Sequence, residues 1–401
     1  MRTWLVLTAI LVSLTPACAS AKKKPLPPVK AATIAVPEVV AAEITNFDEP
    51  SPKRLEHPGA SYISVYFEGV RLGPQDKLTV KSDRADGASW TYTAADVPKS
   101  GAFWSIAIPG VPAGGDESAL STVVLIELDN KSGTAAYTVP RYAAGLLPPE
   151  IDNENQRSGF LEVCGTDDTK EARCFADQQA IYNNAKPVAR LLINGRNACT
   201  GWLVGGAGHL LTNHHCIGDA EDAQNVQVEF MAEGDSCQKN CKSWFACRGK
   251  VVATSGQLLK ASSTKDYALL QLDPKVTRPY GYLKLRRAGP KLGERVYIPQ
   301  HPRGSGKRVA VNSSEPRDKT GPTPGFTHIN SLTEWACGGI SKNETGYLAD
   351  TDPGASGSPV IAFSDNTVVA LHHCGGCPNR GIPIDKIIPE IQSFLPANAF
   401  K

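Results

Sequence analysis

One stretch near the C-terminal end combines residue types suited to nucleophilic catalysis. Residues 350–360 read DTDPGASGSPV, and Ser356 lies between Gly354 and Gly357. Glycines allow a tight turn that exposes a serine hydroxyl and lets backbone N–H groups approach a developing oxyanion. We therefore interpret Ser356 as the candidate nucleophile.

Two upstream segments offer the partners that such a serine needs. His214 and His215 precede Cys216, and Asp266 enters the apolar run 267–272. The order His, Asp, Ser is one of the known linear arrangements of a hydrolytic triad. The three segments together predict a serine endopeptidase, with either histidine as the general base.

Length and composition bound the class of protein. The 401 residues have room for two domains or three small ones, and 41% are apolar and 20% charged. A net charge of +2 indicates no nucleic-acid partner. The 36 glycines and 30 prolines, with few helix-period runs, favour an all-β architecture.

The N-terminus and the cysteines predict export. Arg2 precedes a short apolar run, and small residues follow it, so residues 1–21 are typical of a signal peptide. Alternatively, Cys18 is a lipidation site that anchors the chain to a membrane. The other ten cysteines all follow residue 160, and an even set in an exported chain predicts disulfides. The expected location is secreted, periplasmic or lipid-anchored at the cell envelope.

Turn signals and strand patterns divide the remaining chain. Residues 22–58 are rich in Lys, Pro, Ala and Glu and are expected to be a disordered tether. Residues 59–147 alternate short strand patterns with turn residues, which predicts a β-sandwich. Residues 148–160 are interpreted as a linker and 161–401 as the peptidase domain. Four aromatic residues of the sandwich are expected in its core: Trp90, Tyr92, Phe103 and Trp104. Alternatively, they form a face that binds a surface ligand.

From about residue 161 the chain resembles the trypsin/chymotrypsin-fold serine endopeptidases, and it is most similar to bacterial lysyl endopeptidases and glutamyl endopeptidases. The matching segments are residues 198–204, 211–216, 264–272, 298–302, 352–359 and 371–376. The resemblance implies a chymotrypsin-like double β-barrel of two six-stranded barrels, with the active site between them. Residues 383–395 have apolar residues at helical spacing and predict a short C-terminal helix.

The resemblance also assigns roles to single residues. His215 would be the general base, Asp266 would orient it, and the N–H groups of Gly354 and Ser356 would form the oxyanion hole. A bridge between Cys199 and Cys216 would brace the histidine loop, which favours His215 over His214. No cofactor or metal is expected, and the substrate is a protein or peptide.

The family's disulfide pattern implies two further pairings. Cys164 would pair with Cys374 or Cys377, and Cys174 with Cys237 or Cys241, which leaves Cys247 and Cys337 open. Cys374 and Cys377, beside His372 and His373, could instead form a zinc or redox site. Ala355 occupies the place where animal trypsins carry an aspartate that pairs with a new N-terminus, so activation by that salt bridge is excluded.

The sequence leaves two interpretations of which substrate residue is accepted at the cleaved position. Asp350 lies six residues before Ser356 and would favour Arg or Lys at the cleaved position, whereas Thr351 and His372 occupy positions where glutamyl endopeptidases receive a carboxylate. Asp350 could also be a solvated loop residue. Two rival functions share the fold: an esterase with the same triad, and a catalytically silent binding or adhesion protein.

Overall fold

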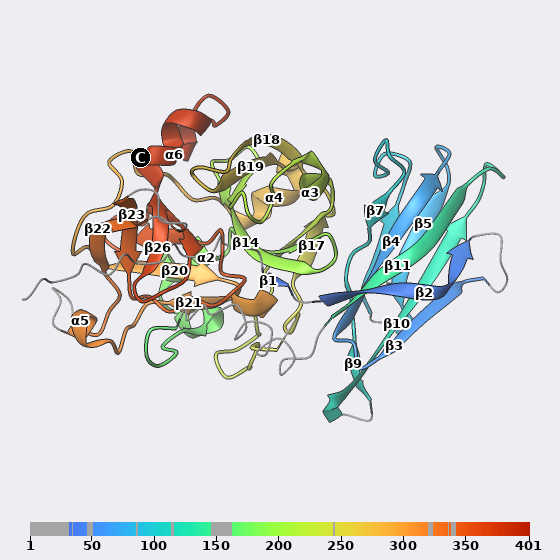
Figure 1. Ribbon diagram of the computed structural model, residues 1–401, viewed down its shortest axis with the longest axis horizontal. Helices are drawn as coiled ribbons and strands as arrows, with labels where there is room; N and C mark the ends of the chain where they lie inside the picture. The colour runs from blue at the N-terminus through green and yellow to red at the C-terminus, as the bar shows by residue number, and fades with distance from the viewer. Residues whose placement is uncertain are drawn as a thin grey trace, which may run out of the picture.

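Strands dominate the structure, as the composition predicts, and they form two all-β parts that lie side by side in Figure 1. The computed structural model describes residues 32–33, 35–45, 51–85, 87–113, 116–145, 163–243, 245–319, 324–335, 337 and 342–401. The expected signal peptide, Cys18 and the expected linker 148–160 lie outside the described residues. No helix in the described part of the chain is long and apolar enough to span a bilayer.

The first part is a sandwich of two antiparallel sheets. One sheet has the order β3 (Lys53–Pro58), β10 (Asp116–Asp129), β5 (Lys77–Ser82) and β6 (Ser89–Tyr92), with β9 (Val111–Ala113) beside β10. The other has the order β2 (Ala35–Thr45), β11 (Ala136–Gly145), β4 (Tyr62–Arg71) and β7 (Phe103–Trp104), with β8 (Ile108–Pro109) beside β4. Alternate residues of these strands meet in one apolar core, as the period-two patterns require.

The prediction of a disordered tether over residues 22–58 is wrong where the structure describes it. Strand β2 pairs with β11, and β3 pairs with β10, so both belong to the sandwich. Strand β1 (Ala32–Thr33) pairs with residues 197 and 198 in the second part. The Pro- and Glu-rich composition hid these strands, because edge strands tolerate Pro and charged residues.

The second part contains two curled antiparallel sheets, which confirms the chymotrypsin-like fold. The first has the order β17 (Lys250–Ala253), β16 (Val226–Phe230), β13 (Val188–Ile193), β14 (Asn197–Val204), β15 (His209–Thr212), β19 (Tyr267–Gln271) and β18 (Gln257–Ser262), with β1 beside β14. The second has the order β12 (Lys170–Glu171), β21 (Arg308–Ala310), β20 (Val296–Gln300), β24 (Pro359–Ala362), β25 (Val368–Cys374), β26 (Asn379–Pro383), β23 (Lys342–Tyr347) and β22 (Ile329–Trp335). Among the residues that the structure describes, each sheet counts eight strands rather than the expected six; the additions include β1, which pairs with the interior strand β14, and the two-residue edge strand β12.

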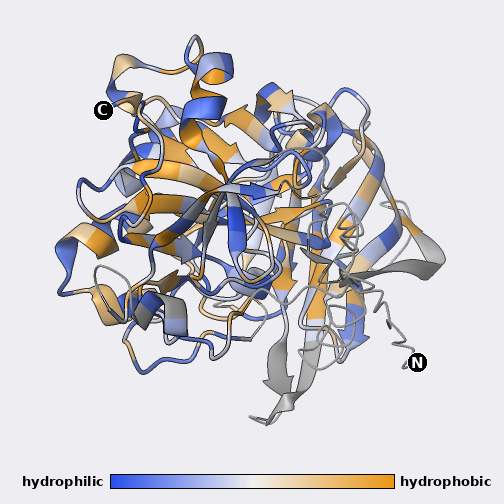
Figure 2. Cartoon of the chain, turned by 60° about the vertical axis from the view of Figure 1, so that its left-hand side comes forward, coloured by the Kyte–Doolittle hydropathy of each residue, from blue (hydrophilic) through white to orange (hydrophobic). Residues whose placement is uncertain are grey.

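Apolar strand faces hold these sheets together, and hydrophobic stretches run along their strands in Figure 2. Short helices fill the connections: α2 (Gln179–Ala185), α3 (Ala220–Gln224), α4 (Pro274–Thr277), α5 (Pro316–Lys319) and α6 (Ile384–Ile391). Helix α6 is the predicted C-terminal helix. It buries four isoleucines at helical spacing against the core, Ile384, Ile387, Ile388 and Ile391.

The sandwich docks directly on the first curled sheet. The hydroxyl of Tyr62 donates to the carbonyl of Gly195 at 3.0 Å, and the backbone N–H of Trp104 donates to Asn225 Oδ1 at 3.0 Å. Among the aromatics singled out above, Tyr92 and Phe103 are buried in the sandwich core, as expected. Trp104 is half-buried at the docking surface, so it belongs to the contact between the two parts.

Candidate active site

His215 and Asp266 meet where the histidine loop follows β15 and a turn precedes β19. His215 Nδ1 lies 2.7 Å from Asp266 Oδ2, and the backbone N–H of His215 donates to Asp266 Oδ1 at 2.9 Å. The carboxylate therefore holds both the ring and the main chain of His215. His214 is half-exposed, and Asp266 bonds to its neighbour instead.

The contact with Asp266 decides the tautomer of His215. When Nδ1 carries the proton donated to the carboxylate, Nε2 keeps a free lone pair. Nε2 is buried and has no hydrogen-bond partner among the residues that the structure describes. This nitrogen is thus the one atom of the ring that could accept a proton from a nucleophile.

The backbone at Asp266 adopts a conformation that non-glycine residues rarely use. Its φ is 41°, and Asn213 Nδ2 donates to its carbonyl oxygen at 2.7 Å. Such conformations cost of order 1–3 kcal/mol and persist where the surrounding structure enforces them. Here the strained turn directs the carboxylate back toward the histidine loop.

A second histidine contacts the same carboxylate, and sequence reasoning missed it. His373 Nδ1 lies 3.0 Å from Asp266 Oδ2, and its Nε2 lies 2.9 Å from a carboxylate oxygen of the buried Glu344. Neighbouring residues of a strand face opposite sides of the sheet, so the pair His372-His373 in β25 offered a signal that one ring could face the cleft.

The charges of Asp266, His373 and Glu344, which contact one another in series, reinforce one another. Burial would lower the pKa of His373, but its hydrogen bonds and attraction to Asp266 and Glu344 outweigh burial and raise the pKa to about 9. Burial would raise the pKa of Asp266, but the charges and hydrogen bonds of His215 and His373 hold it well below its usual range. At neutral pH an imidazolium at His373 therefore lies between two carboxylates.

The loop that carries Ser356 is anchored to both curled sheets. The backbone N–H of Thr200 in β14 donates to the carbonyl of Ser356 at 2.8 Å, and Cys216 Sγ lies 4.0 Å from that same oxygen. On the other side, the N–H of Gly357 donates to the carbonyl of His372 at 2.9 Å. Ser356 thus lies beside the residue that follows His215.

Glycine is required next to Ser356. At Gly357 φ is +88°, and a Cβ atom would lie 2.1 Å from the carbonyl oxygen of Thr200. The close approach of the loop to β14 therefore depends on the missing side chain.

The N–H groups of the loop separate into two sets. Those of Ala355, Gly357 and Ser358 donate to backbone carbonyls at 2.9, 2.9 and 3.0 Å. Those of Gly354 and Ser356 donate to no acceptor among the residues that the structure describes. The two N–H groups expected to form the oxyanion hole are the ones that remain available for a ligand oxygen.

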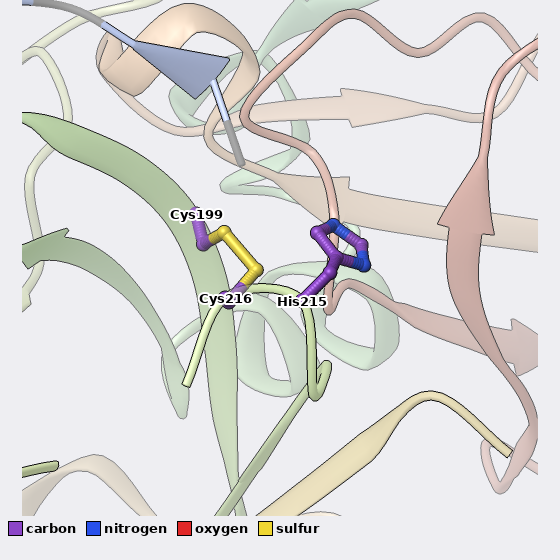
Figure 3. A group of neighbouring side chains, drawn as sticks. All are labelled: Cys199, His215 and Cys216. Atoms are coloured by element: carbon purple, nitrogen blue, oxygen red, sulfur yellow. A yellow bond between two sulfur atoms is a disulfide. The ribbon is translucent and has the colours of Figure 1, made fainter. Parts of the chain in front are cut away.

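The disulfide between Cys199 and Cys216 joins β14 to the histidine loop directly beside His215, as Figure 3 shows. Four further bridges join cysteines of the second part: Cys164–Cys377, Cys174–Cys237, Cys241–Cys247 and Cys337–Cys374. The first two bridges decide the pairings left open above: Cys164 pairs with Cys377 rather than Cys374, and Cys174 pairs with Cys237 rather than Cys241. Because Cys374 and Cys377 bond to two different cysteines far away in the sequence, neither offers a thiolate to zinc and the two form no bridge with each other.

Asp350 has a different environment from the one expected. Its Oδ1 accepts the N–H of Cys164 at 3.0 Å, and its Oδ2 accepts the N–H of Asp168 at 2.8 Å. The residue is 2% exposed, so it is no solvated loop residue. Burial raises its pKa to about 7. Each oxygen thus accepts one main-chain N–H, and the role of Asp350 as the floor of a pocket for basic side chains stays a prediction.

Thr351 and His372 are both buried, but they face different surroundings. Thr351 lines a cavity of about 200 Å³ together with Gln300 and Arg303. His372 Nδ1 lies 2.7 Å from the hydroxyl of Tyr347, and burial with the charges of nearby histidines lowers its pKa to about 3. His372 is therefore neutral at physiological pH.

Comparison with known proteins supplies the family. Residues 199–371 match the family model of the trypsin-like peptidase domain. The chain is 46% identical over 354 residues to the secreted RxLR effector protein 73 of Plasmopara viticola, covering 85% of this chain and 82% of that protein. The chain belongs to the same family as this effector. Its second part is a trypsin-like peptidase domain.

More distant likenesses concern parts of the chain. An uncharacterized protein, y4fB, of Sinorhizobium fredii (strain NBRC 101917 / NGR234) is 30% identical over 190 residues, which are 45% of this chain and 26% of that protein. A serine endoprotease from Yersinia pestis is 16% identical with a TM-score of 0.39, covering 54% of this chain and 65% of that one. A Glu endopeptidase in complex with MPD has the same identity and TM-score and covers 58% of this chain and 98% of that one.

Proposed function

We propose that this protein is an exported serine endopeptidase that hydrolyses peptide bonds with Ser356, His215 and Asp266. The trypsin-like peptidase domain gives the reaction class. The observation that carries the proposal is the His215–Asp266 pair, with a buried and unpartnered Nε2, next to a serine loop with two free N–H groups.

The reaction follows from these atoms. Ser356 Oγ attacks the carbonyl carbon of the scissile peptide bond while His215 Nε2 takes its proton. The negative charge on the carbonyl oxygen is stabilised by the N–H groups of Gly354 and Ser356. His215 then returns the proton to the leaving amine, and water hydrolyses the acyl-enzyme by the same steps. The residues themselves suffice, so we propose no cofactor.

Asp266 keeps His215 in the reactive tautomer and stabilises the imidazolium that forms. His373 and Glu344 extend this arrangement, because the positive charge of His373 keeps Asp266 ionised. Asp266 therefore accepts no proton during the reaction.

Export is the second element of the proposal. Five disulfides lie in the described part of the chain, and disulfides persist in oxidising compartments. The 46% identical relative is described as a secreted effector. The N-terminal run typical of a signal peptide agrees with export.

The test is cleavage of a mixed peptide library by the full chain and by Ser356→Ala. We expect the variant to lose at least about 10⁴-fold in kcat, because the nucleophile is gone. Ser364→Ala is the matched control, since Ser364 is exposed and lies in a turn after β24. Equal cleavage by wild type and Ser356→Ala would contradict the triad. Ester hydrolysis without peptide cleavage would indicate the esterase, and no hydrolysis of either would indicate the binding protein.

A further inference from the structure

Arg303 bonds to the nucleophile loop at two points that the triad does not explain. It lies in the 3₁₀-helix η3 (Pro302–Gly304), which follows β20. Its backbone N–H donates to the carbonyl of Pro353 at 2.5 Å, and its side-chain Nε donates to Asp352 Oδ2 at 2.6 Å. The two acceptors belong to the two residues before Gly354, so one arginine holds the segment that leads into the expected oxyanion hole.

The bond to Pro353 bears on the direction of an oxyanion donor. The carbonyl of Pro353 and the N–H of Gly354 belong to one peptide group, which is planar and trans, so they point to opposite sides. While Arg303 binds the carbonyl, the N–H of Gly354 therefore points away from Arg303. This N–H donates to no acceptor among the described residues, and it is one of the two groups proposed to stabilise the oxyanion.

The backbone at Gly354 does not fix this direction by itself. Its φ is +100°, and a glycine enters this region and its mirror image with similar ease, so the peptide before it could also turn the other way. A Cβ atom at Gly354 would lie 2.8 Å from the backbone nitrogen of Arg303, so the two segments pack as closely as only glycine allows. The orientation of the peptide therefore depends on its contact with Arg303.

The turn that contains Arg303 is itself anchored to the rest of the domain. Its φ of 55° and ψ of 22° lie in the left-handed region, which an arginine rarely adopts. The carbonyl of the next residue, Gly304, accepts a hydrogen bond from the buried Arg190 at 3.1 Å. The N–H of His301 donates to Thr200 Oγ1 at 3.0 Å, and that hydroxyl donates to the nucleophile loop. Conformations of this kind persist where surrounding contacts enforce them, and they cluster at functional sites.

The ion pair between Arg303 and Asp352 is placed to fix geometry rather than to stabilise the fold. The two side chains are 35% and 23% exposed, and ion pairs with such access to water add little to the free energy of unfolding. The carbonyl of Asp352 also accepts the N–H of Ala355 at 2.9 Å. Asp352 thus joins the strained turn to both sides of Gly354.

We infer that Arg303 is a positioning residue, which together with Asp352 holds the Pro353–Gly354 peptide with its N–H toward the oxyanion. The inference rests on the proposed function and adds a residue to its site. The negative charge on the substrate oxygen develops only on the way to the transition state. A loss of the peptide orientation should therefore lower kcat and leave KM nearly unchanged.

The first experiment measures kcat and KM of Arg303→Asn on a peptide that wild type cleaves. Asparagine tolerates the left-handed backbone but carries no charge. We expect kcat to fall by about 10- to 100-fold, because complete removal of an oxyanion donor costs about 10²- to 10³-fold, and KM to stay within about threefold. Arg303→Lys should retain most of kcat, since the positive charge stays.

Lys242→Asn is the matched control for the loss of a charge. Lys242 lines the same cavity as Arg303 and pairs with Asp167 at 3.0 Å, and among the described residues it forms no bond to the nucleophile loop. Its kcat should stay within about threefold of wild type. Asp352→Asn removes the ion pair from the other side and should reproduce the loss of Arg303→Asn, which keeps the inference testable if the arginine variant does not fold.

A transition-state analogue separates positioning from general damage to the site. A peptide aldehyde with the substrate's sequence bonds its carbonyl carbon to Ser356 Oγ, the hydroxyl proton passes to His215 Nε2, and the former aldehyde oxygen becomes the oxyanion. In Arg303→Asn this aldehyde should bind about 10- to 100-fold more weakly than in wild type. The corresponding peptide amide, which forms no oxyanion, should bind within about threefold.

Two results would overturn the inference and leave the endopeptidase standing. One is an unchanged kcat in Arg303→Asn and Asp352→Asn, whatever their melting temperatures, because a purely structural role moves only stability. The other is an equal loss of affinity for the aldehyde and the amide. Equal cleavage by wild type and Ser356→Ala, or no cleavage by wild type, would instead reject the proposed function and the inference with it.

Discussion

Asp266 and Asp350 are two largely buried carboxylates in the same domain, and their surroundings differ in one respect. Asp266 is bonded by two histidine rings, whereas Asp350 is bonded by two backbone N–H groups. The histidines can carry charge, so the pKa of Asp266 falls well below its usual range. The amides cannot, so burial dominates and the pKa of Asp350 rises to about 7.

The comparison teaches that burial alone does not give an aspartate its role. A carboxylate beside ionisable partners stays charged and can stabilise an imidazolium during catalysis. A carboxylate that only accepts backbone hydrogen bonds fastens one segment to another. Asp350 thereby ties residues 164–168 to the stretch that leads to Ser356.

The largest expected effect comes from Asp266→Asn. An asparagine keeps the size of the side chain but presents an amide that favours the wrong tautomer of His215. We expect kcat to fall by about 10⁴-fold at neutral pH, as this change does in related triads. Peptide hydrolysis under saturating substrate measures it, with circular dichroism to show that the variant folds. A loss below tenfold would show that Asp266 does not orient the base.

The next effect concerns the charge behind Asp266. The pKa of His373 is raised in the folded protein to about 9, above its ordinary value near 6.5, so its contribution to stability is present below about pH 6.5. That contribution is lost as the pH rises through 9, on the order of 3 kcal/mol. Urea unfolding at pH 6 and pH 10 should therefore show a larger loss for wild type than for His373→Gln.

The control for this measurement is His57→Gln in the sandwich, where His57 Nδ1 contacts the hydroxyl of Tyr142. It should follow the wild-type pH dependence. Parallel pH curves for wild type and His373→Gln would mean that His373 is not charged in the folded protein.

The smallest effect on catalysis is expected for Asp350→Asn, the same change at the second carboxylate. An asparagine offers one oxygen to two N–H donors, so the free energy of unfolding should fall by about 1–3 kcal/mol. If Asp350 only fastens these segments, the relative rates on peptides that carry Glu, Gln or Lys at the cleaved position should change by less than about threefold. A gain or loss of cleavage after Lys in this variant would support Asp350 as a specificity residue.

The raised pKa of Asp350 also predicts how the stability difference between wild type and Asp350→Asn changes with pH. Because the pKa of Asp350 is raised to about 7, its folded state favours the protonated carboxyl, and that stability is complete below about pH 4. It is lost as the pH rises through 7. The stability gap between wild type and Asp350→Asn should therefore shrink between pH 4 and pH 8. A gap that widens over this interval would contradict the environment described for Asp350.

Much of the fold and of the candidate site could be predicted from local patterns. Alternating strands and turn residues predict the sandwich, and the runs around His215, Asp266 and Ser356 each contain the residue with the neighbours its chemistry needs. The structure brings His215 and Asp266 into contact, and the carbonyl of Ser356 lies 4.0 Å from Sγ of Cys216, the residue after His215. The strands β2 and β3 were missed, because their Pro- and Glu-rich composition resembles that of a disordered segment.

The sequence by itself determined the all-β class and the trio of candidate catalytic residues, because turn chemistry, strand periodicity and the neighbours of a nucleophile are local properties of the chain. Only the tertiary structure decided that Cys164 meets Asp350, that Glu344 faces His373 and that Arg380 of β26 pairs with Cys374 at the end of β25. These contacts join strands and loops far apart along the chain. Whether a buried charge meets an opposite charge, a backbone amide or no partner depends on that packing, and so does its role.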